Sequence, residues 1–595
     1  MKKIYLAIAL VSALLPVQAQ TNVTGPTVSG AWTLSGSPYI VKADLTVPAG
    51  SKLRIDPGVQ VLVDGPYLIT VNGSLLANGK EAQRISFRAK DTTGWGNIMV
   101  GHGGWRGIHF SPAGSGVDSS IFRYCDVRDI KNAYEYADGI CTERSLRIVH
   151  CYFTHNRDMA PVWLKSEDPA VSVVVDSCEF YKNRGHAVYG GYVFRAETAG
   201  MSYLRNSKIY GTEWNTQPIY IAGGRMTVER CEVYDNPADD RLGRYGGAIF
   251  AGWTDELVIR NNKLYRNEGE RAGALYIMDV NGPIDIDNNF ISNNFAWGAH
   301  LCDNGGGAIA IYGTTAPVRI RNNVMANNES TYKGGAINLE GVSAVITNNT
   351  MINNVSRNHG KAIYVGTHNG GSLTDTVKLL VKNNIFQSNV SFFATKDIFA
   401  EKRTRIVFDH NFTNSPVSAM IGGTYGFVSI AGDTTHNIMG SDPGMQSPTI
   451  TSGMITDATA ANFGLKNTSP CVNKGDTALC ATLSLDIANR TRIAQGRIDI
   501  GAYEFQSGTT GIGTGPQKSE GRLSVYPNPA SGQVTLSLST TGGTLRITDI
   551  AGRILWSSAV REKVLSVSLA QFAPGLYYVQ WWDGTLKGTT SFVRR

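Results

Sequence analysis

The chain is short of long apolar runs, of clustered charge and of helical periodicity. After residue 19, no stretch reaches the 18 or so apolar residues of a membrane-spanning helix. The formal charge of +7 is spread thinly over 595 residues with no basic run, which argues against nucleic acid as a partner. The central repeats carry no sustained helical period, which argues against a helical solenoid. Abundant glycine (66 residues) and 42% hydrophobic residues are instead typical of a turn-rich β protein with an ample core.

The first 19 residues have the pattern of a secretory signal. Lys2 and Lys3 precede an apolar run over residues 4–15, and Val17-Gln18-Ala19 supplies a small-residue end. We expect cleavage before Gln20 and an exported mature chain.

One sequence motif recurs through residues 257–384. A short apolar run ends in an Asn pair whose second members are Asn262, Asn289, Asn323, Asn349 and Asn384, at spacings of 27, 34, 26 and 35 residues. A second motif, typified by Gly306-Gly307-Ala308-Ile309, follows most of these Asn pairs. Such a period predicts a stacked repeat. Because the runs are short, β-branched and alternating, the repeat is interpreted as the coil of a parallel β-helix, with coils about 4.8 Å apart.

The Asn column continues upstream with cysteine. Its predicted members are Cys125, Cys151, Cys178, Ser207, Cys231, Asn262, Asn289, Asn323, Asn349, Asn384 and Asn411. We expect these side chains to point inward and the asparagines to hydrogen-bond their neighbours above and below, because buried amides must be satisfied. A linear column does not supply converging metal ligands, so the cysteines are interpreted as buried, unreactive thiols, and no metal site is predicted.

The opening coils resemble those of secreted right-handed parallel β-helix proteins. The phrases that carry this resemblance are Val47-Pro48-Ala49-Gly50, Asp56-Pro57-Gly58 and Trp105-Arg106-Gly107-Ile108-His109-Phe110. The resemblance covers roughly residues 40–430 and implies an all-β, right-handed parallel β-helix, which we expect over residues 20–430. It implies little about activity, since this fold carries lyases, hydrolases, adhesins and tail spikes.

Residues 431–506 lose the repeat register. The motif Asp499-Ile500-Gly501-Ala502-Tyr503-Glu504 resembles the closing segment of surface-exposed bacterial β-helix proteins, so these residues are expected to be the C-terminal cap of the solenoid. Cys471 and Cys480 flank a short loop and are expected to form a disulfide in an exported protein. The sequence suggests no partner for Cys141 or Cys302.

A separate module follows a flexible linker at residues 507–521. Alternating strands over residues 522–595 predict a small β-sandwich. The elements Tyr526-Pro527-Asn528-Pro529-Ala530 and Pro574-Gly575-Leu576-Tyr577-Tyr578-Val579 resemble the C-terminal sorting domain of type IX secretion cargo. The resemblance implies passage through the type IX machinery and a protein that is secreted or attached to the outer-membrane surface. A carbohydrate-binding sandwich is the alternative interpretation of this module.

The strand after each glycine turn is predicted to present an aromatic stripe on the outer surface. Its members are Trp163, Tyr189, Tyr220, Phe250 and Tyr276. Rigid aromatic rings bind the flat C–H faces of sugars, so the stripe predicts a platform for an extended polysaccharide or host surface glycan. The alternative is that loops cover the stripe and that the aromatics only stabilise the sheet.

Catalytic residues are not identified. A glycosidase needs two carboxylates about 5–10 Å apart, and a lyase of this fold would pair a basic residue with acidic Ca²⁺ ligands. The outward-facing candidates are scattered over many coils: His109, Glu143, Lys165, His186, Asp279, Asp303 and Glu340. Ser-His-Asp chemistry lacks a G-x-S-x-G elbow. We therefore predict a monomeric, non-catalytic glycan-binding protein or adhesin without a cofactor. The alternative is an extracellular polysaccharide lyase or glycoside hydrolase, with Ca²⁺ if it is a lyase.

Overall fold

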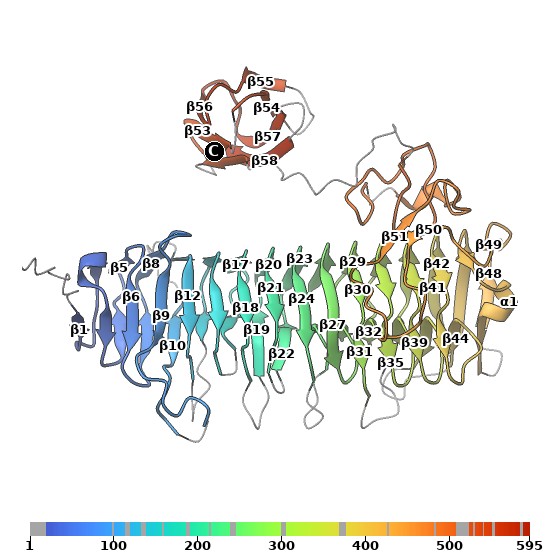
Figure 1. Cartoon of the computed structure of the whole chain (residues 1–595), viewed down its shortest axis with the longest axis horizontal. Helices are drawn as coiled ribbons and strands as arrows, with labels where there is room; N and C mark the ends of the chain where they lie inside the picture. The colour runs from blue at the N-terminus through green and yellow to red at the C-terminus, as the bar shows by residue number, and fades with distance from the viewer. Residues whose placement is uncertain are drawn as a thin grey trace, which may run out of the picture. The chain divides into compact units, whose positions relative to one another are not determined.

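Three long parallel sheets form the N-terminal part of the computed structural model, and the coils stack in a row along one axis (Figure 1). The structure describes residues 20–594, with gaps at 98–99, 113–119, 132–138, 158–159, 186–190, 214–215, 239–244, 299–304, 368–375, 425–427, 481–483, 507–522, 527–529, 539–540, 550–553 and 583–586. The fold is a right-handed parallel β-helix, as predicted, with almost no α-helix in the described residues. Residues 1–507 and 508–595 belong to two separate compact units.

Sheet B forms one face of the coils. Its strands are β4 (Leu45–Val47), β7 (Leu68–Val71), β10 (Gly107–Phe110), β13 (Ile140–Thr142), β16 (Val162–Ser166), β19 (Gly191–Thr198), β22 (Thr216–Ala222), β25 (Ile249–Gly252), β28 (Leu275–Met278), β32 (Ile309–Tyr312), β36 (Ile337–Glu340), β40 (Ile363–Gly366), β44 (Ile398–Ala400) and β47 (Ile421–Gly423).

Sheet C follows sheet B in each coil. Its strands are β2 (Gly30–Trp32), β5 (Lys52–Ile55), β8 (Ser74–Asn78), β11 (Ile121–Arg123), β14 (Leu146–Val149), β17 (Ser172–Asp176), β20 (Met201–Arg205), β23 (Arg225–Glu229), β26 (Glu256–Arg260), β29 (Ile284–Asp287), β33 (Val318–Arg321), β37 (Ala344–Thr347), β41 (Val377–Lys382), β45 (Thr404–Asp409) and β48 (Val428–Ala431).

Sheet A completes the coil. Its strands are β1 (Thr21–Val23), β3 (Tyr39–Val41), β6 (Gln60–Val63), β9 (Ile85–Ala89), β12 (Cys125–Arg128), β15 (Tyr152–Thr154), β18 (Glu179–Tyr181), β21 (Lys208–Tyr210), β24 (Glu232–Asn236), β27 (Lys263–Gly269), β30 (Phe290–Ser292), β34 (Val324–Ala326), β38 (Thr350–Ile352), β42 (Ile385–Gln387), β46 (Phe412–Thr413) and β49 (Ile438–Met439), with the short strands β31 (Phe295–Ala296), β35 (Glu329–Ser330), β39 (Val355–Ser356) and β43 (Val390–Ser391). The helical pieces are η1 (Leu34–Gly36), α1 (Val417–Met420) and η3 (Thr477–Cys480).

The core fills the inside of the coils, because alternate residues of every strand point inward. In the strand pair β29 and β33, Ile284 and Val318 are in register, as are Ile286 and Ile320, and all four side chains are buried. The intervening Asp285 and Arg319 face outward and pair with one another at 3.2 Å. This alternation fixes the register of each coil on the next.

The bend between sheets C and A carries an amide ladder. Asn289 Nδ2 donates to the side-chain oxygen of Asn323 at 3.0 Å and to the carbonyl of Ile259 at 2.8 Å, and the same pattern runs from Asn262 to Asn411. Upstream, the Asn262 oxygen accepts the Cys231 N–H and the Ser207 oxygen accepts the Cys178 N–H. Asparagine, serine and cysteine therefore occupy one column.

A second amide ladder lies five residues further along each coil and was not predicted. Asn267 Nδ2 donates to Asn294 Oδ1 at 3.0 Å, and Asn294 Nδ2 donates to Asn328 Oδ1 at 2.9 Å. The ladder continues through Asn354 and Asn389. Two satisfied ladders per coil give this part of the solenoid its sharply defined bends.

The residue before each ladder position points the other way and holds the C-terminal segment. Asn293, Asn327 and Asn353 have left-handed backbones (φ 53–57°), which asparagine tolerates. Their amides donate to the carbonyls of Thr456, Thr451 and Thr449, each at 2.7 Å. From Thr449 to Thr456 the chain thus runs back along the side of the solenoid.

This lateral placement differs from the expected cap of the last coil. Strands β50 (Met445–Ser447) and β51 (Asn462–Leu465) pair with one another. Together with Cys471, Ile500 and Ala502, this segment packs against Val324, Ala326, Ile352, Ile385 and Phe412 on the outside of sheet A. Figure 1 shows β50 and β51 alongside β42 and its neighbours. Residues 443–505 are therefore a lateral cover, and their apolar contacts explain why the outer face of sheet A is apolar there.

Charged residues inside the lateral cover form a structural network. The Asp486 carboxylate accepts from Arg490 Nη2 at 2.7 Å and from the Glu504 N–H at 2.9 Å. Glu504 accepts the Asp499 N–H at 3.0 Å. Burial, with the neighbouring Asp499 carboxylate, raises the pKa of Glu504 to about 7.

The cysteines of the described solenoid are buried. Cys125, Cys151, Cys178 and Cys231 carry free thiols, and burial raises the pKa of Cys231 to about 12. Cys471 is also a free, buried thiol, and the side chain of Cys480 lies outside the described residues, so the predicted disulfide is not shown. Cys141 is buried beside Trp163, and Cys302 lies outside the described residues.

The C-terminal module contains two antiparallel sheets around its own core. One sheet has β52 (Leu523–Tyr526), β53 (Gln533–Leu538) and β56 (Val564–Ser568). The other has β54 (Thr544–Thr548), β55 (Ile554–Ala559), β57 (Gly575–Trp582) and β58 (Lys587–Arg594). The predicted linker lies outside the described residues. No helix among the described residues is long and apolar enough to cross a membrane.

Candidate functional site

The predicted aromatic column exists on the outside of sheet B with one change. Cross-strand register aligns Trp163, Arg195, Tyr220, Phe250 and Tyr276 on consecutive coils. Arg195 takes the position predicted for Tyr189, which lies outside the described residues. In this coil the strand is β19, which begins at Gly191. The prediction had placed the strand around Tyr189, which is too early in the sequence.

Most of this column is buried. Trp163 is 8% exposed, Phe250 2% and Tyr276 1%, while Tyr220 is partly buried. Burial, with the neighbouring tyrosine and glutamate, raises the pKa of Tyr220 to about 12. The predicted residues therefore form a floor, and Phe250 and Tyr276 have almost no surface for a ligand.

A second layer of aromatics lies on this floor. The rings of Tyr192 and Tyr220 are 4.4 Å apart, Tyr245 lies 5.4 Å from Phe250, and Trp253 lies 6.1 Å from Phe250. Tyr245 is 42% exposed and Trp253 is 49% exposed. We call Tyr192, Tyr220, Tyr245 and Trp253 the aromatic patch. Tyr220 belongs to the predicted column, and Tyr192, Tyr245 and Trp253 add aromatic surface that the sequence analysis had assigned to the column alone.

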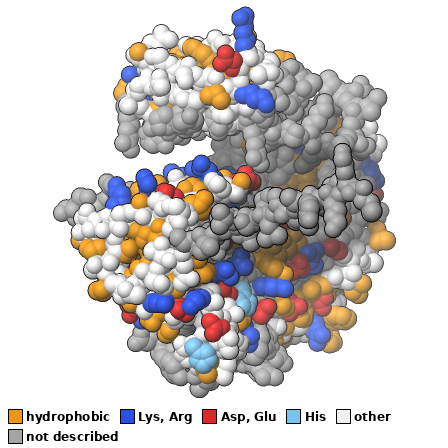
Figure 2. Space-filling model, turned by 60° about the vertical axis from the view of Figure 1, so that its left-hand side comes forward, with side chains coloured by type: hydrophobic (Ala, Val, Ile, Leu, Met, Phe, Trp, Pro, Cys, Tyr) orange, Lys and Arg blue, Asp and Glu red, His pale blue; other side chains and the backbone are white. Residues whose placement is uncertain are grey.

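Charged side chains border the patch. The Arg195 guanidinium lies 4.1 Å from the Trp163 ring centre and bonds Glu197 at 2.8 Å, and Trp163 Nε1 donates to the same carboxylate at 3.1 Å. At the other end, Arg271 donates to the Tyr276 hydroxyl at 3.0 Å and lies 5.1 Å from the Tyr245 ring. These contacts fix the aromatic side chains and place hydrogen-bonding groups beside them. On the face of the molecule shown in Figure 2, coloured charges of both signs lie among apolar side chains.

Two other groups on sheet B involve candidate acid–base residues. His109 Nε2 lies 2.8 Å from Glu143 Oε1, and both side chains are partly exposed. Further along, the Tyr364 hydroxyl donates to Glu401, whose carboxylate also lies 3.7 Å from the Lys333 ammonium. Lys165 lies beside Trp163, at 5.3 Å from its ring. His186 and Asp303 lie outside the described residues.

The second group has carboxylates at matching positions on two of three successive coils. Glu340, Gly366 and Glu401 follow one another on three coils, and a side-chain carbon at Gly366 would collide with Glu340 Oε2 at 2.1 Å. The Glu340 carboxylate therefore extends over the coil that separates it from Glu401. Glu340 is only 1% exposed, which limits its access to a substrate.

A histidine–aspartate cluster lies at the end of sheet C. Ligand atoms of Asp409, His410 and His436 all lie within 4.8 Å of one another. The two imidazole rings stack at 4.5 Å with an angle of 18° between planes, and both Nδ1 atoms face the Asp409 carboxylate, at 2.8 Å for His410 and 3.2 Å for His436. The Lys382 ammonium lies 3.8 Å from the Asp409 carboxylate and partly neutralises the negative charge that a metal ion would need. The cluster is best described as a network of ion pairs and hydrogen bonds, and its nitrogen donors do not suit Ca²⁺.

Four tyrosines form an unpredicted ladder on the outside of sheet A. Successive rings of Tyr181, Tyr210, Tyr234 and Tyr265 are 4.6, 4.8 and 5.0 Å apart and stacked, with interplanar angles of 27°, 5° and 12°. Because each ring face between them covers the next ring, the ladder has few faces left for sugar stacking. Its function is structural along most of its length.

Several of these features have signals in the sequence. The second amide ladder appears as a repeated asparagine five residues after the first. The tyrosine ladder appears as Tyr at the third position of four consecutive sheet A strands, β18, β21, β24 and β27. Tyr245 and Trp253 flank a strand instead of lying in it, so strand alternation could not reveal them.

Comparison with protein families finds two matches. The model described as a right handed beta helix region matches residues 166–351. The model described as a secretion system C-terminal sorting domain matches residues 524–594. The comparison with curated proteins finds no match. The chain thus combines a β-helix with a type IX sorting module, which supports export to a secreted or cell-surface location through the type IX machinery.

Proposed function

We propose that this exported β-helix protein binds an extended glycan through the aromatic patch on sheet B. The carrying observation is that Tyr245 and Trp253, both large aromatics, are 42% and 49% exposed on either side of the buried Phe250. Exposed aromatics that are fixed by a rigid sheet lose little entropy on binding and suit the C–H faces of sugar rings.

The dimensions of the patch favour a polymer. The register residues of β19, β22, β25 and β28 lie on four successive coils, so the patch and its floor span about 14 Å at the usual strand spacing. Arg195, Glu197 and Arg271 border it and offer donors and acceptors for hydroxyl groups. A polysaccharide or a host surface glycan has this combination of apolar faces and hydroxyl edges.

A polysaccharide lyase or hydrolase is the second candidate. The Tyr364, Glu401 and Lys333 group favours it, because a carboxylate held by a hydroxyl and an ammonium is a common element of acid–base sites. The low exposure of Glu340 weighs against it.

One panel separates the two candidates. The mature protein is tested against neutral and acidic polysaccharides by gel retardation, with and without Ca²⁺. Reducing ends and the absorbance of unsaturated uronates are followed in parallel. Retardation without product supports the binding function. Product that is lost in Glu401→Gln establishes an enzyme. Absence of both retardation and product across the panel would refute glycan binding.

A further inference from the structure

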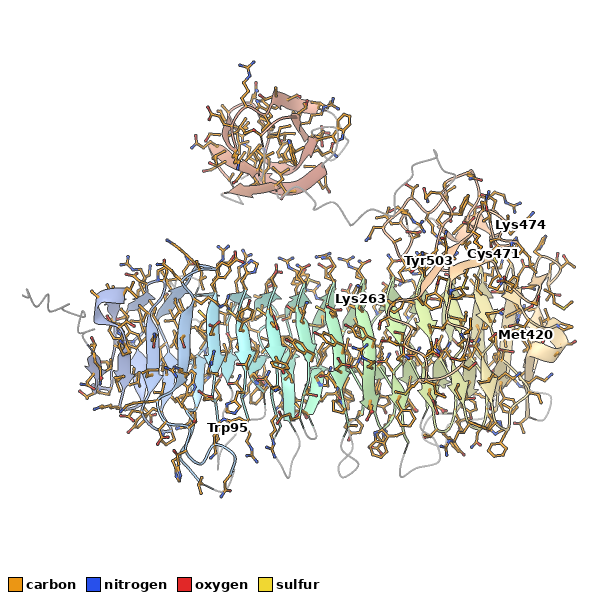
Figure 3. All side chains as sticks on the ribbon, in the orientation of Figure 1. Trp95, Lys263, Met420, Cys471, Lys474 and Tyr503 are labelled. Atoms are coloured by element: carbon orange, nitrogen blue, oxygen red, sulfur yellow. The ribbon has the colours of Figure 1, made fainter. Side chains whose placement is uncertain are left out.

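We infer that a pocket between sheet A and the lateral cover is a second ligand site, which takes a sugar ring carrying one carboxylate. The pocket encloses about 440 Å³, within the range of small-molecule sites. Its lining residues are Glu232, Lys263, Tyr265, Phe290, Thr459, Ala461, Ile487 and Tyr503. Figure 3 labels Lys263 on the solenoid and Tyr503 on the cover, which belong to opposite walls.

The pocket lies where the tyrosine ladder stops. Tyr265 is the last ring, because its register neighbour in the next coil is Ser292. The cover then approaches the sheet, and Phe290 and Phe463 are 6.1 Å apart. The space between the end of the ladder and the cover is therefore walled by aromatic rings on both sides, as a sugar or another ring compound requires.

The walls are held in place from outside the pocket. Arg266 bonds Asp457 of the cover at 3.2 Å, and the Asn293 oxygen accepts the Ala458 N–H at 2.8 Å. A rigid pocket needs little reorganisation on binding, which favours affinity.

Lys263 gives the pocket its charge preference. Its side chain is exposed, and among the described residues its ammonium has no ion pair. The one acidic residue in the lining, Glu232, is already bonded by the Tyr265 hydroxyl at 2.8 Å and approached by the Lys208 ammonium at 3.7 Å. The available positive charge is therefore that of Lys263, and a carboxylate is the anionic group that acidic sugars supply.

This site is independent of the aromatic patch, since the patch lies on sheet B and the pocket on sheet A. Its ligand could be the acidic end of a chain or a free sugar acid, and the chemistry that the pocket recognises is the same.

The test is saturation-transfer NMR and calorimetry on the mature full-length chain, with glucuronate and galacturonate as probes. Glucose, galactose and inorganic phosphate are the comparison ligands. We expect saturable uronate binding at least tenfold tighter than binding of the neutral sugars or phosphate. Lys263→Gln should remove this preference, and Tyr503→Ala should weaken binding, while Tyr503→Phe retains it.

The matched control is Lys466→Gln, which removes an exposed lysine of the cover outside the pocket lining and should leave binding unchanged. Tyr245→Ala/Trp253→Ala should also leave it unchanged, which separates this proposal from the glycan-binding function. Equal binding of uronate and neutral sugar, equal binding of phosphate, unchanged affinity in Lys263→Gln, or no saturable binding would each overturn the inference.

Discussion

Replacement of Asn323 by alanine should destabilise the centre of the solenoid strongly. Asn323 is fully buried and makes four side-chain hydrogen bonds. Its amide donates to the Ile286 carbonyl at 2.7 Å and to Asn349 Oδ1 at 3.0 Å, and its oxygen accepts two N–H groups of Asn289 at 2.9 and 3.0 Å. Alanine would leave the Ile286 carbonyl and two N–H groups of Asn289 without these partners, while Asn349 Oδ1 would keep only the Asn323 backbone N–H. At about 1–3 kcal/mol for each buried group, and with losses that are not additive, we expect roughly 3–6 kcal/mol.

Serine is the informative comparison at the same position. Ser207 occupies this column upstream, where its hydroxyl accepts the Cys178 N–H at 3.0 Å and donates its O–H to the Arg205 carbonyl at 2.8 Å. Asn323→Ser should therefore cost less than half as much as Asn323→Ala. Because a solenoid need not unfold in one step, hydrogen exchange of peptides from β29 to β37 is measured beside urea unfolding. An alanine variant within 1 kcal/mol of wild type, or serine as damaging as alanine, would refute the ladder argument.

Two further predictions concern titratable groups. The pKa of Glu504 is about 7 in the folded protein against an ordinary 4.5, so its stabilisation is complete below pH 4.5 and is lost as pH rises through 7. The shift corresponds to about 3 kcal/mol, and Glu504→Gln should remove that component from urea unfolding curves between pH 4.5 and 8; an unaltered pH slope would contradict it. The buried column thiols should resist maleimide at pH 7 in the native protein and react in guanidinium, as followed by peptide mass spectrometry; rapid native labelling of Cys231 would show that the column is accessible.

The repeat made the architecture predictable, because both its spacing and the alternation of apolar residues within each strand can be read directly from the sequence. A 26-residue spacing with alternating apolar positions defines one coil, and the buried amide at its bend must find a partner in the next coil. The prediction explained only the second asparagine of each Asn-Asn pair and gave no role to the first. Consecutive residues point in opposite directions, so Asn289 faces the core while Asn288 faces outward, and outward asparagines of this kind hold the lateral cover.

The functional surface was less predictable, because its accessibility depends on residues outside the repeat. Phe250 is in the column predicted for ligand contact, yet Tyr245 and Trp253 from the flanking turns lie over it. The strand β19 begins later in its coil than the repeat spacing suggests. As a result Arg195, and not the predicted Tyr189, occupies the column. The pocket at Lys263 requires residues from Thr459 to Tyr503, about 200 to 240 positions further along the chain, and local sequence carries no signal for such an approach.

The most direct test of glycan binding by the aromatic patch is calorimetry with the polymer that the panel selects. The mature wild-type protein is compared with Tyr245→Ala/Trp253→Ala, and Phe392→Ala/Phe393→Ala serves as the control, since these two aromatics are more exposed still but lie elsewhere. At about 1 kcal/mol for each lost aromatic contact, the patch variant should bind about thirtyfold more weakly, while the control binds like wild type. Equal affinity of the patch variant and wild type would contradict the account.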